Sequence, residues 1–232
     1  MQEETLADAA AVAQRAAEII AGAAREAVAR RGRFLLATSG GSTPWLMLRR
    51  LADEAVPWPQ VHLFQVDERV APEGDPARNL THLRASLLVH LPVQPGGVHP
   101  MPVMVADLAA GAAAYAVTLR SIAGTPAVLD LVHLGLGEDG HTASLLPSDP
   151  ALEISDADVA LAGPYAGHLR LTLTFPVLDR ARQLLWVVTG AAKAAALGRL
   201  RRGDGTIPAA RVRRGSATLL SDLAAGRERG AP

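Results

Sequence analysis

Apolar positions along the chain recur with two periods, one typical of helices and one typical of buried strands. Apolar residues at helical spacing predict helices over residues 5–31, 44–54, 79–89, 106–123, 176–181 and 190–200. Short, mostly apolar runs predict strands over residues 33–38, 61–66, 98–101, 128–136, 159–162, 168–175 and 183–189. Strands that alternate with helices predict an α/β fold with a single doubly wound, mostly parallel sheet flanked by helices, and residues 1–232 are expected to form one domain.

Capping residues predict where several of these helices begin and end. Thr5 with Asp8 is expected to cap the first helix at its start, and Gly32 is expected to end it. Thr43 is expected to cap the second helix, with Pro44 as its first residue. Asn79 is expected to cap the third helix.

Composition excludes several classes of function. The chain has 232 residues, no cysteine, and 23 basic against 23 acidic residues, so disulfides and thiolate metal sites are absent and no net charge attracts nucleic acid or membrane. No apolar run approaches the roughly 18 residues of a membrane span. The acidic N-terminus lacks the basic start of a signal peptide, so a cytoplasmic protein is expected.

Six arginines between positions 199 and 214 form the densest basic segment. No aromatic residues are interspersed among them as in many nucleic-acid-binding segments. We interpret the segment as a solvated rim that attracts an anionic substrate.

The loop that follows strand 128–136 carries the strongest chemical signal. Gly137 and Gly140 permit a sharp turn, and Glu138, Asp139 and His141 place two carboxylates and an imidazole within it. Ligands of open α/β sheets bind at the carboxyl ends of strands, so this position is typical of an active-site loop.

Three further loops are expected at the same edge of the sheet. Residues 39–43 join a strand to a helix N-terminus, which is suited to anions, although the segment is neither a P-loop nor Gly-x-Gly-x-x-Gly. Asp67 and Arg69 follow the strand over residues 61–66, and Lys193 lies in the first turn of a helix, where a cation is unfavourable unless an anion is near. An ordinary turn and solvated surface charges remain the alternatives for these loops.

Together these motifs resemble the glucosamine-6-phosphate isomerase/6-phosphogluconolactonase family over nearly the whole chain. The resemblance rests on Ser39-Gly-Gly-Ser-Thr-Pro44, Asp67-Glu-Arg69 with Asn79, Gly135-Leu-Gly-Glu-Asp-Gly-His-Thr-Ala-Ser-Leu-Leu-Pro147, Arg170-Leu-Thr-Leu-Thr174, Gly190-Ala-Ala-Lys193 and Ile207-Pro-Ala-Ala-Arg211. It implies the Rossmann-like fold of glucosamine-6-phosphate deaminase. It also implies a hydrolase of 6-phospho-D-glucono-1,5-lactone, in the oxidative branch of the pentose phosphate pathway, that needs neither a metal nor an organic cofactor.

The implied site has two ends. His141 is the candidate general base for water, because an imidazole exchanges protons near neutral pH, and Asp139 is the candidate that orients it, with Glu138 as the alternative. Amides of the glycine turn are candidates to stabilise the oxyanion. The expected substrate-binding residues are Ser39, Gly40, Gly41, Ser42, Thr43, Asp67, Arg69, Asn79, Arg170 and Lys193. Arg78 stands where the family pattern has Ser, which leaves the role of Asn79 open.

Two other functions share parts of this pattern. A glucosamine-6-phosphate deaminase would resemble the chain, but its pattern has an Asn-Glu-Pro shortly after the histidine, where this chain has Thr142-Ala-Ser-Leu-Leu-Pro147. A phosphosugar-sensing domain of a transcription regulator would bind without turnover, and would give His141 and Asp139 no purpose. The expected partner is a phosphorylated sugar lactone, with no nucleic acid or membrane, and the chain is expected to be a monomer or weak homodimer.

Overall fold

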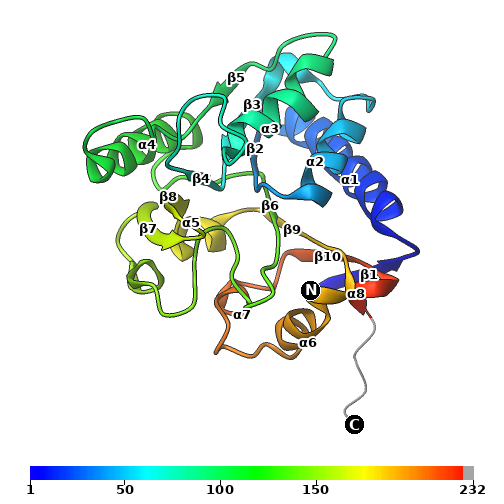
Figure 1. The fold of residues 1–232 in the computed structure, drawn as a ribbon. Coiled ribbons are helices and arrows are strands. Elements are labelled where there is room, and N and C mark those ends of the chain that lie inside the picture. Colours follow the sequence, from blue (N-terminus) through cyan, green and yellow to red (C-terminus); the bar gives the residue numbers. More distant parts are fainter. Residues whose placement is uncertain (227–232) are drawn as a thin grey trace.

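A seven-stranded parallel sheet forms the centre of the computed structural model, which describes residues 1–226 (Figure 1). Its strand order is β1-β10-β9-β6-β2-β3-β5, and every neighbouring pair is parallel. The strands are β1 (Gln2–Leu6), β10 (Ala217–Asp222), β9 (Gln183–Val188), β6 (Leu131–Leu134), β2 (Phe34–Thr38), β3 (Val61–Gln65) and β5 (Gly97–His99). The predicted α/β fold with a mostly parallel sheet is therefore confirmed.

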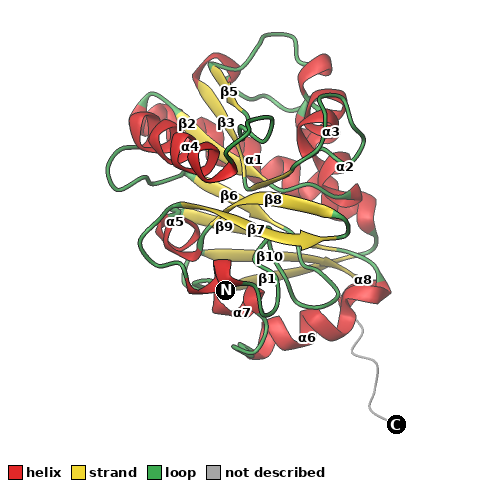
Figure 2. Ribbon diagram, turned by 60° about the vertical axis from the view of Figure 1, so that its left-hand side comes forward, coloured by secondary structure: helices red, strands yellow, loops and turns green. Residues whose placement is uncertain are grey.

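A second, antiparallel sheet was not predicted from the sequence. It has the order β4 (Asp67–Arg69), β8 (His168–Leu173), β7 (Val159–Tyr165), with Asp67 opposite Thr172 and Arg69 opposite Arg170. Figure 2 shows β7 and β8 in front of the main sheet. The pairing places Arg170 of β8 opposite Arg69 of β4, a segment that the sequence predicts to be a loop rather than a strand.

Helices cover both faces of the main sheet (Figures 1 and 2). The α-helices are α1 (Ala9–Arg31), α2 (Ser42–Leu51), α3 (Asn79–Ser86), α4 (Leu108–Ala123), α5 (Phe175–Arg180), α6 (Ala194–Arg202), α7 (Pro208–Arg211) and α8 (Leu223–Gly226). Short 3-10 turns are η1 (Trp58–Gln60), η2 (Leu88–His90), η3 (Pro150–Glu153) and η4 (Ala191–Lys193).

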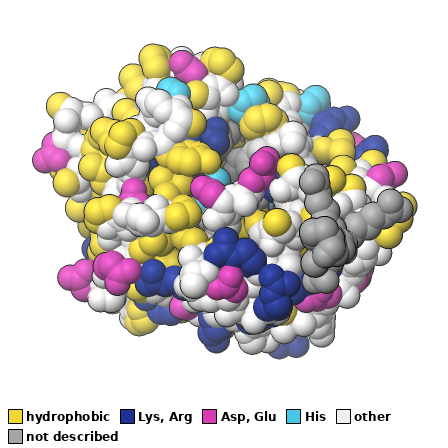
Figure 3. All heavy atoms as spheres, turned by 60° about the horizontal axis from the view of Figure 1, so that its bottom comes forward, with side chains coloured by type: hydrophobic (Ala, Val, Ile, Leu, Met, Phe, Trp, Pro, Cys, Tyr) yellow, Lys and Arg dark blue, Asp and Glu magenta, His cyan; other side chains and the backbone are white. Residues whose placement is uncertain are grey.

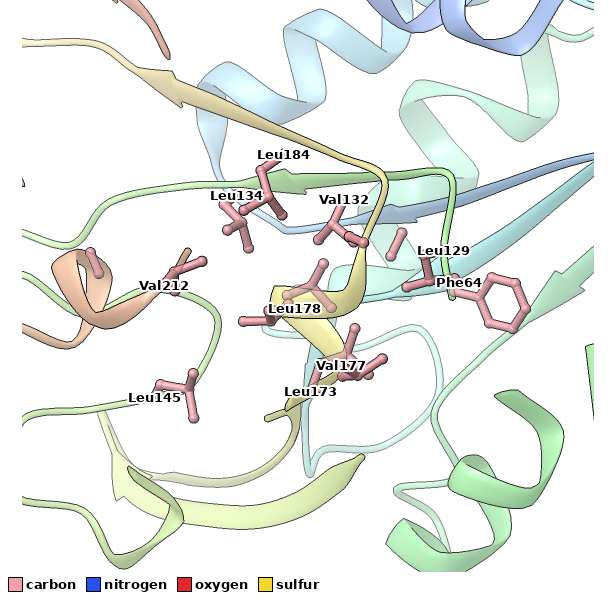
Figure 4. Close-up of a cluster of buried hydrophobic side chains, with 14 of the residues drawn as sticks. Phe64, Leu129, Val132, Leu134, Leu145, Leu173, Val177, Leu178, Leu184 and Val212 are labelled. Carbon is pink, nitrogen blue, oxygen red and sulfur yellow. The ribbon is translucent and has the colours of Figure 1, made fainter. Parts of the chain in front are cut away.

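Alternate residues of each central strand enter two different cores. Phe34 and Leu36 of β2 pack with α1, α2 and α3, whereas Leu35 and Ala37 pack with α4, α5, α6 and the small sheet. Figure 4 shows part of the second core. Both faces of β2 are buried, which explains why its sequence is a continuous apolar run rather than an alternating one.

Several predicted element ends and caps differ in the structure. Thr5 lies in β1, and the cap of α1 is Asp8 alone, whose carboxylate accepts from the Ala11 N–H at 2.8 Å. Gly32 ends α1 in the left-handed conformation, as predicted. The cap of α2 is Gly41 rather than Thr43, and the cap of α3 is Arg78 rather than Asn79. Strand β6 is shorter than the predicted strand over residues 128–136.

Within residues 1–226, no helix has both the length and the apolar character needed to cross a membrane.

Candidate active site

A pocket of about 310 Å³ lies at the carboxyl ends of the central strands. It brings together the loops after β2, β6 and β9 with residues of the small sheet. Of the twelve residues expected at the site, eleven line it: Ser39, Gly40, Gly41, Ser42, Thr43, Asp67, Arg69, Asn79, His141, Arg170 and Lys193. Asp139 does not line the pocket but contacts His141 from behind.

The imidazole of His141 is fixed by Asp139. Nδ1 of His141 lies 2.6 Å from Oδ1 of Asp139, and the same oxygen accepts from the His141 backbone N–H at 3.1 Å. Partial burial acts to raise the pKa of Asp139, but the hydrogen bonds and charge of His141 outweigh it and hold that pKa below its ordinary value. An ionised Asp139 favours a proton on Nδ1 and leaves Nε2 as the basic nitrogen.

Gly137 makes room for this pair. A Cβ at position 137 would lie 2.1 Å from Nδ1 of His141 and 2.5 Å from Oδ1 of Asp139. Any side chain there would displace one of the two residues, so the glycine is required by close approach rather than by its backbone angles.

The loop around His141 is held by its own backbone and by the later segment 207–211. The Gly137 N–H donates to the His141 carbonyl at 2.8 Å, and the Gly140 N–H donates to the Gly137 carbonyl at 3.1 Å. The Gly140 carbonyl accepts from the Ala209 N–H at 3.0 Å. The amides of Gly137 and Gly140 are thus engaged within the loop, so the expectation that they stabilise an oxyanion is wrong for these two groups.

Glu138 approaches Lys193, whereas the carboxylate that hydrogen-bonds to the His141 imidazole is that of Asp139. The Glu138 carboxylate lies 3.8 Å from Nζ of Lys193, and its side chain is largely exposed. Asp139 is therefore the carboxylate that orients the imidazole in this structure, and Glu138 is not.

The loop after β2 forms the N-terminus of α2. Gly41, with φ of 129°, precedes the helix, and no side chain caps the first turn. Ser39 is fixed by two hydrogen bonds to His133 of β6. Its N–H donates to Nδ1 of His133 at 3.2 Å, and its hydroxyl donates to the His133 carbonyl at 3.0 Å. The uncapped helix end, with its positive dipole, faces the pocket and suits an anion.

Three cations line the same pocket. Nη1 of Arg69 donates to the Ala77 carbonyl at 2.7 Å, and Nη2 of Arg170 donates to the Tyr165 carbonyl at 3.2 Å. Burial lowers the pKa of Arg170 below its ordinary value, although Asp67, 3.9 Å away, opposes this. The Nε atoms of Arg69 and Arg170 are buried without a hydrogen-bond partner in the described structure. Together with Lys193 they make this pocket electropositive.

Hydrogen bonds among residues at the pocket wall explain the position of Asn79. Its Nδ2 donates to the carbonyl and to Oδ1 of Asp67, at 2.9 and 3.2 Å, and the Ser144 hydroxyl donates to Oδ2 of Asp67 at 2.7 Å. A Cβ at Gly40 would lie 1.9 Å from Oδ1 of Asn79. Asn79 therefore connects Asp67 to the glycine loop after β2.

Sequence reasoning missed Tyr165 of β7. Its ring contacts the His141 imidazole edge to face at a centroid distance of 5.3 Å, and the Arg170 guanidinium lies 5.1 Å from the ring centroid. It also missed the pocket-lining residues Leu136, Ala143, Val187, Val188 and Thr189. Small apolar residues and a tyrosine in an unrecognised second sheet give no chemical signal in a single sequence.

The arginine-rich segment 199–214 is not a free basic rim. Arg199 pairs with Asp204, Arg201 with Glu3 and Arg211 with Glu153, at 2.8, 3.0 and 3.2 Å. Figure 3 shows Lys and Arg side chains on this side of the molecule with Asp and Glu side chains among them. Within residues 1–226, no group of three or more His, Asp or Glu side chains is arranged to hold a metal ion.

This fold and pocket define an α/β protein with a cation-lined pocket beside a His–Asp pair. A family model described as Glucosamine-6-phosphate isomerases/6-phosphogluconolactonase matches residues 7–221. The chain belongs to this family.

Relatives with known names agree with that assignment. The chain is 39% identical over 179 residues to the 6-phosphogluconolactonase of Synechocystis sp., covering 75% of this chain and 74% of that protein. It is 33% identical to the 6-phosphogluconolactonase of Nostoc sp., covering 97% of both. A match at 41% identity to the GDH/6PGL endoplasmic bifunctional protein of Oryctolagus cuniculus covers 75% of this chain but only 23% of that protein.

Solved structures share the fold. The 6-phosphogluconolactonase from Trypanosoma cruzi superposes with a TM-score of 0.87 at 25% identity, covering 99% of this chain and 97% of that one. A monomeric glucosamine-6-phosphate deaminase superposes with a TM-score of 0.86 at 19% identity, covering 99% and 100%. The second likeness concerns the fold alone.

Proposed function

We propose that this protein hydrolyses 6-phospho-D-glucono-1,5-lactone to 6-phospho-D-gluconate, in the oxidative branch of the pentose phosphate pathway. One observation carries the proposal: a His141–Asp139 pair lies beside a pocket lined by three cations and an uncapped helix N-terminus. Relatives named as 6-phosphogluconolactonases support the same substrate.

In the proposed mechanism His141 is the general base. Nε2 takes a proton from the water that attacks C1 of the lactone, while Asp139 stabilises the imidazolium through Nδ1. The tetrahedral intermediate then collapses, the bond between C1 and the ring oxygen breaks, and the imidazolium returns the proton to the leaving oxygen. The products are a carboxylic acid and a ring-opened hydroxyl, so one water is consumed and His141 ends neutral.

The phosphate is proposed to bind at the other end of the pocket. Residues 39–43 provide the helix N-terminus, Arg69 provides a fork for phosphate oxygens, and Lys193 provides a point charge. Asp67, Asn79 and Arg170 are proposed to contact the sugar or to hold the cations in place. An anion here also offsets the unfavourable position of Lys193 beside the start of α6.

Initial rates of acid release from 6-phosphogluconolactone test the proposal. We expect hydrolysis well above the spontaneous rate measured without protein, and no ammonia from glucosamine 6-phosphate. Ammonia release without lactone hydrolysis would instead assign the chain to the deaminase side of the family. Binding of either sugar without turnover would assign it to a sensing domain.

Three further expectations from the sequence are kept as proposals. We propose that the chain forms one domain, because a single pocket is lined from both sheets; positions 227–232 of that domain lie outside the described residues. A monomeric or weakly dimeric state is to be measured by light scattering. A cytoplasmic location stays a prediction.

A further inference from the structure

Glu68 is a completely buried carboxylate that has no place in the mechanism above. Its side chain is 0% exposed and does not line the pocket, although its neighbours Asp67 and Arg69 both do. Burying an ionised carboxylate is costly unless donors surround it. The arrangement of those donors indicates what Glu68 does.

Both oxygens of Glu68 accept several hydrogen bonds. Oε1 accepts from the backbone N–H groups of Arg69 and Asn79, at 2.9 and 2.7 Å. Oε2 accepts from the Leu80 N–H and from Nε2 of Gln65, at 2.9 and 2.8 Å. Nε of Arg78 lies 3.1 Å from the same oxygen and supplies the compensating charge, with both side chains almost fully buried.

Glu68 thereby caps a helix to which it does not belong. The cap residue of α3, Arg78, makes no side-chain hydrogen bond to the helix start. The carboxylate of Glu68 reaches the first two N–H groups of α3 from the neighbouring strand β4. A negative charge at this end of a helix is also favoured by the helix dipole.

The loop over residues 70–77 is closed by hydrogen bonds from two arginines, both of which Glu68 contacts. Nη1 of Arg69 donates to the Ala77 carbonyl at 2.7 Å, and Nη1 of Arg78 donates to the Ala71 carbonyl at 3.3 Å. Arg69 precedes the loop and bonds to its last residue, whereas Arg78 follows the loop and bonds near its start. Glu68 accepts from the Arg69 N–H and pairs with the Arg78 guanidinium. The position of Arg69 at the pocket depends on these hydrogen bonds between the two ends of the loop.

We propose that Glu68 is a positioning residue for substrate binding. By holding the backbone of Arg69 and Asn79, it determines where the Arg69 side chain meets the phosphate end of the substrate. The position of Asn79 in turn fixes that of Asp67, to which its side chain donates two hydrogen bonds. Asn79 also packs closely against Gly40. The inference rests on the proposed function.

The variant Glu68→Gln tests this inference, since glutamine keeps the size of the side chain but replaces one acceptor oxygen by a donor. We expect KM for 6-phosphogluconolactone to rise about tenfold, with kcat within about threefold of the wild-type value. For unphosphorylated glucono-1,5-lactone we expect kcat/KM to stay within about threefold, because that substrate has no phosphate to position.

Asp130→Asn is the matched control. Asp130 is also a buried carboxylate, which accepts from the Leu35 N–H at 2.9 Å and pairs with Arg31 and Arg182 at 2.8 and 3.3 Å, but it lies before β6 at the opposite end of the sheet. The Asp130→Asn variant should unfold at a lower temperature than the wild type, and its KM should be unchanged. An unchanged KM in Glu68→Gln, or an equal loss with both lactones, overturns the inference.

Two further measurements cover other outcomes. If Glu68→Gln does not fold, the double variant E68Q/R78M removes the unpaired buried guanidinium, and the same rise in KM is expected; a wild-type KM in that variant overturns the inference. The rise in unfolding temperature caused by inorganic phosphate does not depend on turnover. This rise in unfolding temperature should be largely lost in Glu68→Gln and kept in Asp130→Asn. If both variants keep it, the positioning role is contradicted, even if the protein does not hydrolyse the lactone.

Discussion

Gly137 shows how much of the chemistry depends on one residue without a side chain. The close contact of His141 and Asp139 over its backbone leaves no space for a Cβ. Sequence reasoning identified Gly137 as a turn residue, but the reason it must be glycine is visible only when the loop is folded.

Gly137→Ala should therefore lower kcat by about 10- to 100-fold, because it displaces the general base while leaving the phosphate end intact. KM should change little. Gly205→Ala, at an exposed position where a Cβ meets nothing within 4 Å, is the control and should retain wild-type kinetics. A wild-type kcat in Gly137→Ala would show that the His141–Asp139 geometry is not needed.

Asp139→Asn should lower kcat by about 10²-fold or more, since an amide cannot stabilise the imidazolium and favours the wrong tautomer. Glu138→Gln is the matched control on the same loop, because Glu138 contacts Lys193 and not His141. Its kcat should stay within about threefold of the wild-type value. A larger loss of kcat in Glu138→Gln than in Asp139→Asn would show that Glu138, and not Asp139, orients His141.

His133 makes the stability of the fold depend on pH. Complete burial lowers the pKa of His133 to about 3, whereas an unfolded histidine titrates near 6.5. Between these values the unfolded chain binds the extra proton, so stability rises with pH through this window and is lost as pH falls from about 6.5 toward 3.

His133→Asn should weaken that dependence, because Asn retains an acceptor for the Ser39 N–H and does not titrate. Urea unfolding at pH 7.5 and pH 5.0 measures the effect. The wild type should lose about 2 kcal/mol more than the variant between the two values. The half-buried pair His62 and His99, whose pKa values are also lowered by partial burial, is present in both proteins and cancels in the comparison. Equal losses would place the pH sensitivity elsewhere.

At the scale of elements, periodicity predicted the longer helices and most of the strands, including the edge strand β5, but it missed β1, β4 and β10 and the short helices α7 and α8. β1 reads Gln2-Glu-Glu-Thr-Leu6, which has little apolar character because it pairs only with β10 and is largely exposed. The helix was therefore expected to begin at Thr5. β4 has three residues and gives no pattern of its own, so the second sheet could not be inferred.

The element that carries Lys193 gives a direct test of the phosphate end. Lys193→Ala and Arg69→Ala should each raise KM for the phosphorylated lactone by about tenfold or more, because a charge-assisted contact to phosphate is lost, with less effect on kcat. The unphosphorylated lactone should be unaffected. Arg120→Ala, an exposed position on α4, is the control. If both lactones suffer equally, these residues do not bind the phosphate.

At the scale of the whole molecule, the rule that parallel strands end at the same edge of a sheet correctly predicted that the segments after β2, β3, β6 and β9 meet at one pocket. Loops separated by more than a hundred residues, such as those of Ser39 and Lys193, were expected to meet and do so. The rule does not predict how the loops are held. The cap that Glu68 provides to α3 and the contact of Tyr165 with His141 depend on a second sheet that brings distant residues together.

The measurement that tests the central claim most directly compares wild type with His141→Ala in the hydrolysis of 6-phosphogluconolactone, followed as acid release with the spontaneous rate subtracted. Removing the general base should lower kcat by about 10²- to 10⁴-fold and leave KM within a few-fold, because the groups at the phosphate end remain in place. A variant that keeps near-wild-type kcat would contradict the proposal that His141 activates the water.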